Sequence, residues 1–173
     1  MRLGLSVFLL VLLLSGAGAV AFNSQQVERV KRIRACEGCD LSGADLVSVD
    51  LSGAALMETN LRGANLRGAR LSSANMFQAI LSQADLRNAN MQEANMTLVD
   101  LGKADLRGAN LSEANLYEAN LAEADLREAQ LDRAELFAAD LRSAKGLTQD
   151  QLEKACGDET TQLPDGMRIG TCD

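Results

Sequence analysis

The sequence predicts a solenoid of short stacked repeats, and two observations carry that prediction. Apolar residues recur at every fifth position from Leu41 to Leu141, a period that fits neither the alternation of a strand nor the stripe of a helix. Of these 21 central positions, 18 are Leu and three are Met. The chain also has only one Tyr and four Phe and no Trp, so Leu and Ala must fill a thin core.

Residues 1–21 are predicted to be a signal peptide. Arg2 precedes an apolar run from Leu3 to Leu14, and small residues follow up to Ala21. The run is shorter than the roughly 20 residues needed to span a bilayer, although its extension to residue 22 leaves an uncleaved anchor as the alternative. We therefore expect cleavage after Ala21 and export to the bacterial periplasm or the medium, or to the thylakoid lumen if the source is a cyanobacterium.

Residues 22–38 are expected to form an N-terminal capping segment that ends in a CxxC motif. Val27, Val30 and Ile33 lie three residues apart, with Ser24 as a possible N-cap, which predicts a short amphipathic helix. The basic residues of this segment are Arg29, Lys31, Arg32 and Arg34. A solvated helix face is the simplest interpretation of them, and binding to anionic lipid or to a partner is the alternative.

Residues 39–143 repeat a five-residue pattern, A(D/N)Lxx. Ala stands two residues before the centre in 17 of 21 repeats, and Asp or Asn usually stands one residue before it. This pattern resembles the pentapeptide-repeat family. The resemblance implies an all-β solenoid, a right-handed quadrilateral β-helix in which four pentapeptides form one square coil with the central and Ala positions inside. The 21 pentapeptides then make about five coils, and the sheet spacing gives a rod about 25 Å long.

Residues 144–173 are expected to cap the other end, because exposed backbone edges favour aggregation. The repeat register breaks at Gly146, and Thr148 with Gln151 forms a capping-box pattern. A short helix is predicted here. Its inward residues are Leu147, Leu152 and Ala155.

The four cysteines, Cys36, Cys39, Cys156 and Cys172, all follow the signal peptide, which favours disulfides. Cys36 and Cys156 would lie at opposite ends of the rod, too far apart to bond. We expect a Cys156–Cys172 bond that ties down the tail, and either a structural bond or a buried thiol at Cys36 and Cys39. A redox or metal role for this CxxC motif is the less favoured alternative.

Residues 20 apart share one side of such a coil, and one side carries an apolar stripe. Its members are Met57, Phe77, Thr97, Tyr117 and Phe137, with Leu98 beside them. A row of apolar side chains on an acidic rod predicts a surface for a protein partner or for self-association. The alternative is that these aromatic side chains stack on one another and only stabilise adjacent coils.

A second side carries a ladder of arginines at the same spacing, formed by Arg67, Arg87, Arg107 and Arg127. Asp85, Asp105 and Asp125 stand two residues before three of them, which predicts a surface ion-pair network in preference to an anion-binding site.

The composition argues against catalysis, metal binding and nucleic-acid binding. The chain has no His and a net charge of −7, so we expect no catalytic residues, no cofactor, no metal site and no nucleic-acid binding. The leading prediction is a non-catalytic exported structural or protein-interaction module, which meets a membrane only if the signal segment stays uncleaved. The family resemblance supplies an alternative, since some members mimic DNA and bind DNA topoisomerases. The export signal disfavours that alternative.

Overall fold

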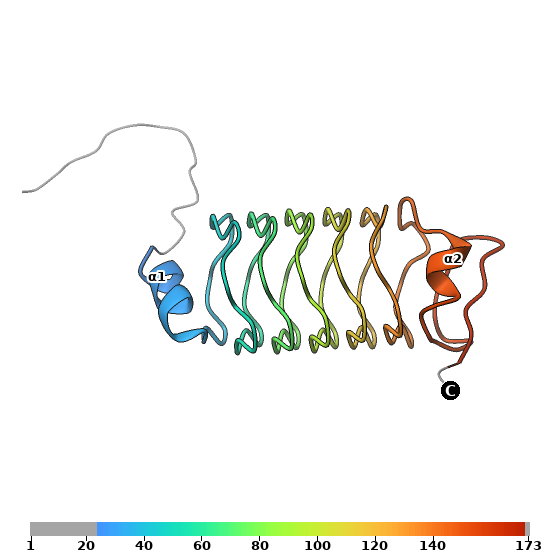
Figure 1. The fold of residues 1–173 in the computed structure, drawn as a ribbon, viewed down its shortest axis with the longest axis horizontal. Coiled ribbons are helices and arrows are strands. Elements are labelled where there is room, and N and C mark those ends of the chain that lie inside the picture. Colours follow the sequence, from blue (N-terminus) through green and yellow to red (C-terminus); the bar gives the residue numbers. More distant parts are fainter. Residues whose placement is uncertain (1–23, 172–173) are drawn as a thin grey trace, which may run out of the picture.

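The structure, a computed structural model, describes residues 24–171 as a single row of stacked coils (Figure 1). Helix α1 (Ser24–Ile33) lies at one end of the row and helix α2 (Gln149–Leu152) at the other. The predicted signal peptide and Cys172 lie outside the described residues. Within the part that is described, no helix is long and apolar enough to cross a bilayer.

The coils are held in register by parallel bridges between residues 20 apart. Nineteen such bridges join the described residues, from Ala35 with Ala55 to Asp125 with Lys145. They remain isolated bridges because each side of a coil contributes only a few extended residues before the chain turns. The bridges begin one pentapeptide earlier than the segment counted from the sequence, since Cys36 occupies a central position and is buried.

A tight turn separates each side from the next and explains the period of five. The carbonyl of Leu41 accepts a hydrogen bond from the amide of Ala44 at 3.1 Å, and the same bond recurs in every pentapeptide up to Ala144. The third residue of each turn has a positive φ, from Gly38 to Ala138. Gly fills only six of these positions, so the other turns hold residues such as Glu118 in the left-handed region at φ 54°. That conformation costs roughly 1–2 kcal/mol for a residue other than Gly.

The interior is a column of central Leu or Met residues and Ala residues, all with almost no exposure. Ala keeps the coils close, and main-chain hydrogen bonds link them. Leu66, for example, donates its amide proton to the carbonyl of Asp85 in the next coil at 2.8 Å. The small and large apolar positions of the sequence therefore correspond to two inward-facing layers.

The Asp and Asn residues before the centres stabilise the turns. Asn90 Oδ1 accepts the amide proton of Gln92 at 3.2 Å, and Asp100 Oδ1 accepts that of Gly102 at 3.0 Å. Both oxygens satisfy a backbone donor two residues ahead, as in Asx turns. This geometry is the physical reason for the D/N position in the repeat.

At the N-terminal end, α1 buries only part of the face expected from its sequence. Val27 and Val30 are buried, and Gln26 Oε1 accepts the amide proton of Asp40 at 3.0 Å. Ile33 is 49% exposed, so its expected place on the buried face is wrong. Ile33 ends the helix and Arg34 follows it with a φ of 51°, so the chain turns before Ile33 contacts the first coil.

At the C-terminal end, the capping box of α2 is present as predicted. Thr148 accepts the amide proton of Gln151, and the Gln151 side chain in turn accepts the amide proton of Thr148. Leu147, Leu152 and Ala155 are buried. The tail then returns to the stack, where Cys156 bridges to Glu135 and Gln162 bridges to Asp140.

Candidate interaction surface

The apolar stripe predicted from the sequence lies along one side of the stack. Bridges connect Asn75, Asn95, Asn115 and Glu135 in successive coils. Each of these residues stands two positions before a stripe residue, so the stripe side chains from Phe77 to Phe137 follow one another up the rod.

Exposure along the stripe is uneven. Tyr117 is 44% exposed and Leu98 is 39% exposed, whereas Met57, Phe77 and Phe137 are half-buried. Thr97 interrupts the apolar row, and its hydroxyl donates to Asn95 Oδ1 at 2.8 Å. The centre of the stripe is therefore the Leu98–Tyr117 pair, joined by a hydrogen bond from the Leu98 amide to the Tyr117 carbonyl at 2.9 Å.

The Tyr117 hydroxyl gives the stripe a polar edge. A hydrogen bond with Glu118, together with the charge of that carboxylate, raises the pKa of Tyr117 above its ordinary value. The phenol stays protonated at neutral pH and is a hydrogen-bond donor beside an apolar surface. Tyr combines these properties at many protein interfaces.

Two further exposed apolar residues lie on other sides of the rod. Val47 follows a central position on the side of the arginine ladder, and Ile80 precedes one on another side. Each is 40% exposed. Neither stands in a column with other large apolar residues, whereas the stripe has Met57, Phe77, Tyr117 and Phe137 in one column.

The arginine ladder forms the predicted ion pairs on three of its four steps. Arg107 donates from Nε to Asp105 Oδ1 at 2.8 Å and from Nη2 to Oδ2 at 2.6 Å. Arg87 and Arg127 bind Asp85 and Asp125 in the same bidentate way. Because Asn65 replaces the Asp two residues earlier, Arg67 forms no ion pair within residues 24–171.

The ladder also couples adjacent coils. Arg87 Nε lies 3.6 Å from Asp105 Oδ2, and Arg107 Nε lies 3.8 Å from Asp125 Oδ2. The hydrogen bond from Arg107 is the main cause that lowers the pKa of Asp105, and partial burial opposes it. These guanidinium groups are already occupied by carboxylates, which leaves them poorly suited to bind an external anion.

The CxxC motif is a disulfide in the first coil. Cys36 and Cys39 are bonded with their Cα atoms 5.3 Å apart, and both are buried. No described cysteine is a free thiol, and no group of His, Cys, Asp or Glu within residues 24–171 is placed to hold a metal ion. Since Cys172 lies outside the described residues, the Cys156–Cys172 bond stays a prediction.

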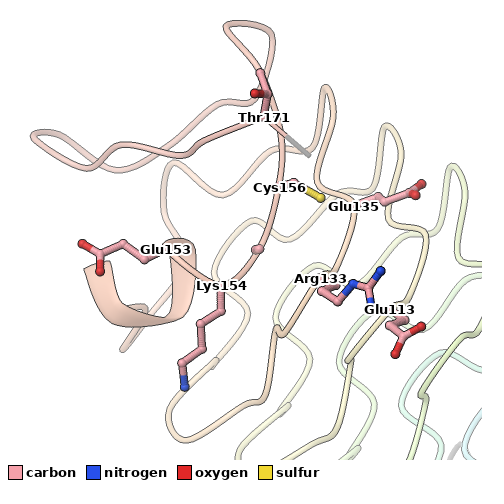
Figure 2. A pocket seen from close by; sticks show the side chains of 8 residues that line it. Glu113, Arg133, Glu135, Glu153, Lys154, Cys156 and Thr171 are labelled. Carbon is pink, nitrogen blue, oxygen red and sulfur yellow. The ribbon is translucent and has the colours of Figure 1, made fainter. Parts of the chain in front are cut away.

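A depression of about 590 Å³ lies between the last coils and the returning tail, a feature that the repeat pattern did not predict. Figure 2 shows Glu153 and Lys154 on one side of it, and Arg133 with Glu113 and Glu135 on the other. The charged side chains point in different directions and do not converge on one point.

Comparison with known proteins agrees with this architecture. The family model described as pentapeptide repeats (8 copies) matches the chain three times, over residues 36–72, 69–108 and 104–142. The chain therefore belongs to the pentapeptide-repeat family, whose members generally serve as structural or interaction modules. Among curated proteins, none matches the chain.

Several solved structures resemble it. HetL, a pentapeptide-repeat protein involved in heterocyst differentiation regulation in Nostoc sp. strain PCC 7120, is 34% identical over 75% of this chain, with a TM-score of 0.41. The chain spans 60% of the length of HetL. A pentapeptide-repeat protein from the Arabidopsis thaliana thylakoid lumen is 24% identical, over 78% of this chain and 85% of its own, with a TM-score of 0.40. A trypsin-treated variant of QnrB1, a plasmid-mediated fluoroquinolone resistance protein, is 22% identical over 78% of this chain and 81% of its own, and its TM-score of 0.54 shows a shared fold.

Proposed function

We propose that this protein is a non-catalytic, exported interaction module whose apolar stripe binds another protein surface, either a second copy or a different chain. The observation that carries the proposal is the exposed Leu98–Tyr117 pair in a row of apolar side chains on an acidic rod. Rows of this kind on a monomer usually mark interaction sites.

The rod suits this role because its surface is preorganised. The main chain of the stripe is held by turns and by hydrogen bonds between coils, such as that from the Gln78 amide to the carbonyl of Thr97 at 3.0 Å. A partner that binds this side would order few main-chain groups, which reduces the entropic cost of association.

The proposal includes a finer description of the rod. We take it as a right-handed quadrilateral β-helix of about five coils, closed by α1 and by α2 with the tail. The 20-residue spacing of the bridges supports four pentapeptides per coil. The capping role is supported by Gln26 at one end and Gln151 at the other, since both bind main-chain groups of the terminal coils.

Export rests on the sequence of residues 1–21 and on the disulfide between Cys36 and Cys39, which suits an oxidising compartment. Mass spectrometry of the protein from the exported fraction tests this step. We expect Phe22 as the first residue, and a full-length chain retained inside the cell would contradict it.

The stripe is tested by the double variant Leu98→Asn/Tyr117→Ser. Asn tolerates the positive φ of 59° at position 98, and Ser already occupies the equivalent position of other turns, as at Ser112. The matched control is Val47→Ser/Ile80→Asn, which removes equally exposed apolar residues from other sides. Solution mass by light scattering and capture of partners from the exported fraction are measured for both.

We expect the stripe variant to lose self-association or partner capture by at least tenfold, and the control to keep it. A tenfold loss corresponds to about 1.4 kcal/mol, which removal of two apolar anchors readily exceeds. If mass and capture are both unchanged in the stripe variant, the stripe is only packing between coils.

A further inference from the structure

The outer face of α1 carries a basic and apolar strip that the proposed function does not use. Arg29, Arg32 and Ile33 lie three and four residues apart and so share one face of the helix. The opposite face, with Val27 and Val30, is buried. Ile33, at 49%, is the most exposed large apolar residue in the part of the chain that the structure describes.

The two arginines of this strip are not neutralised. Within residues 24–171, neither Arg29 nor Arg32 forms an ion pair, whereas Lys31 approaches Glu28 at 3.8 Å and Arg34 binds Asp50 at 2.7 Å. Two free guanidinium groups therefore flank an exposed isoleucine at the end of the rod.

Charge is distributed unevenly between this end and the rest of the molecule. Residues 24–34 contain four basic side chains and one acidic one, and residues 35–171 contain 12 basic and 22 acidic ones. Attraction to an anionic surface is thus confined to the α1 end. Charges farther along the rod lie beyond the Debye length of about 8 Å at physiological salt, so their repulsion is largely screened when the tip makes contact.

We propose that the α1 strip docks the protein end-on to an anionic phospholipid bilayer. Arginine pairs with lipid phosphates, and a neighbouring apolar side chain enters the interfacial layer, which is how basic amphipathic helices bind membranes. Charge complementarity favours a bilayer as the occupant, because the guanidinium groups of Arg29 and Arg32, unpaired among the described residues, flank the exposed Ile33 at the one basic end of an acidic rod.

The test uses the chain that begins at Phe22, which keeps both helices and the whole described stack and removes the apolar run as a source of binding. Its partitioning is measured by flotation with vesicles of phosphatidylcholine alone or of phosphatidylcholine with phosphatidylglycerol. We expect at least tenfold stronger partitioning into the anionic vesicles, and we expect high salt to abolish the difference.

Variants locate the contact. Arg29→Gln/Arg32→Gln is expected to weaken partitioning into anionic vesicles about 30-fold, and Ile33→Ser about fivefold. The control Arg62→Gln/Arg133→Gln makes the same change in net charge with two exposed arginines of the stack, and is expected to stay within about twofold of the unmodified chain. Thermal unfolding of each variant shows whether it remains folded.

Three results would overturn the proposal. Equal partitioning into neutral and anionic vesicles would assign binding to apolar contact alone. An equal loss in the Arg62 and Arg133 control would assign it to net charge. Unchanged binding in the Arg29 and Arg32 variant would exclude α1 as the contact.

Discussion

An Asp before a repeat centre can accept two kinds of hydrogen bond, although the five-residue pattern treats Asp and Asn as equivalent. Asp105 Oδ1 accepts the amide proton of Arg107 at 3.3 Å, which completes the turn, and it also accepts from Arg107 Nε at 2.8 Å. Asn accepts only the first kind, as at Asn65 before Arg67. The choice between Asp and Asn therefore decides where the ladder carries ion pairs.

This difference between Asp and Asn predicts a pH dependence. The hydrogen bond from the following Arg is the main cause that lowers the pKa of Asp85, Asp105 and Asp125 in the folded protein. A lowered folded-state pKa adds stability above the unfolded value of about 3.9, and this stability is lost as the pH falls through the folded-state values. The triple variant Asp85→Asn/Asp105→Asn/Asp125→Asn keeps the turn acceptors and removes the pairs.

We expect the triple variant to lose up to about 1 kcal/mol of stability per pair at pH 7, because the pairs are partly exposed. It should also lose less further stability than the unmodified protein when the pH falls below about 4. Denaturant unfolding at a series of pH values measures both effects. Parallel pH profiles for the two proteins would show that the ladder contributes no linked stability.

The burial of each central residue could be predicted from the sequence, whereas the backbone conformation of the turn residues could not. Every central position from Leu41 to Leu141 is buried, as the period of five predicted. The positive φ at Leu98 or Glu118 has no signal in the sequence, because Leu and Glu rarely adopt it. Hydrogen bonds to two neighbouring coils impose that conformation.

At the scale of elements, a side chain of α2 binds main-chain acceptors of the stack. Gln151 Nε2 donates to the carbonyls of Leu126 and Ala129, each at 2.8 Å. These carbonyls face the end of the stack, where the next coil is replaced by α2. The glutamine thus satisfies the Ala129 carbonyl, adds a second donor to the Leu126 carbonyl, which also accepts the Ala129 amide proton, and forms part of the capping box.

Gln151→Ala is therefore expected to destabilise the protein by about 2 kcal/mol, within the range for unsatisfied, partly buried polar groups. Gln162→Ala, an exposed glutamine of the same segment, is the control and should change stability by less than about 0.5 kcal/mol. Thermal or denaturant unfolding measures both. Equal stability of the two variants would mean that water replaces the side chain at this end.

Sequence patterns predicted the position of both helices better than their contacts. Thr148 and Gln151 are only three residues apart in the chain, so the capping box could be predicted from their spacing alone. The burial of Ile33 depended on where the chain leaves α1, and the turn at Arg34 directs it outward. The depression beside Cys156 depends on the path of the tail, which has no repeat to fix it.

At the scale of the whole molecule, the four sides of the rod have different chemistry. Sorting residues by steps of 20 predicted which side chains share a side, as the bridges show. It did not predict that Tyr117 is more exposed than Phe77, because exposure depends on neighbours in adjacent turns. Three bidentate Arg–Asp pairs interrupt the anionic surface on another side, which disfavours imitation of DNA by this rod.

The most direct test of the central claim is photo-crosslinking from the stripe. A benzoylphenylalanine replaces Tyr117 in one chain and Val47 in another, two side chains of similar exposure on different sides. After irradiation in the exported fraction, we expect a discrete protein adduct, either with a second copy or with a different chain, from position 117 and none from position 47. The same adducts from both positions, or none from position 117, would contradict the assignment of the stripe as the interaction surface.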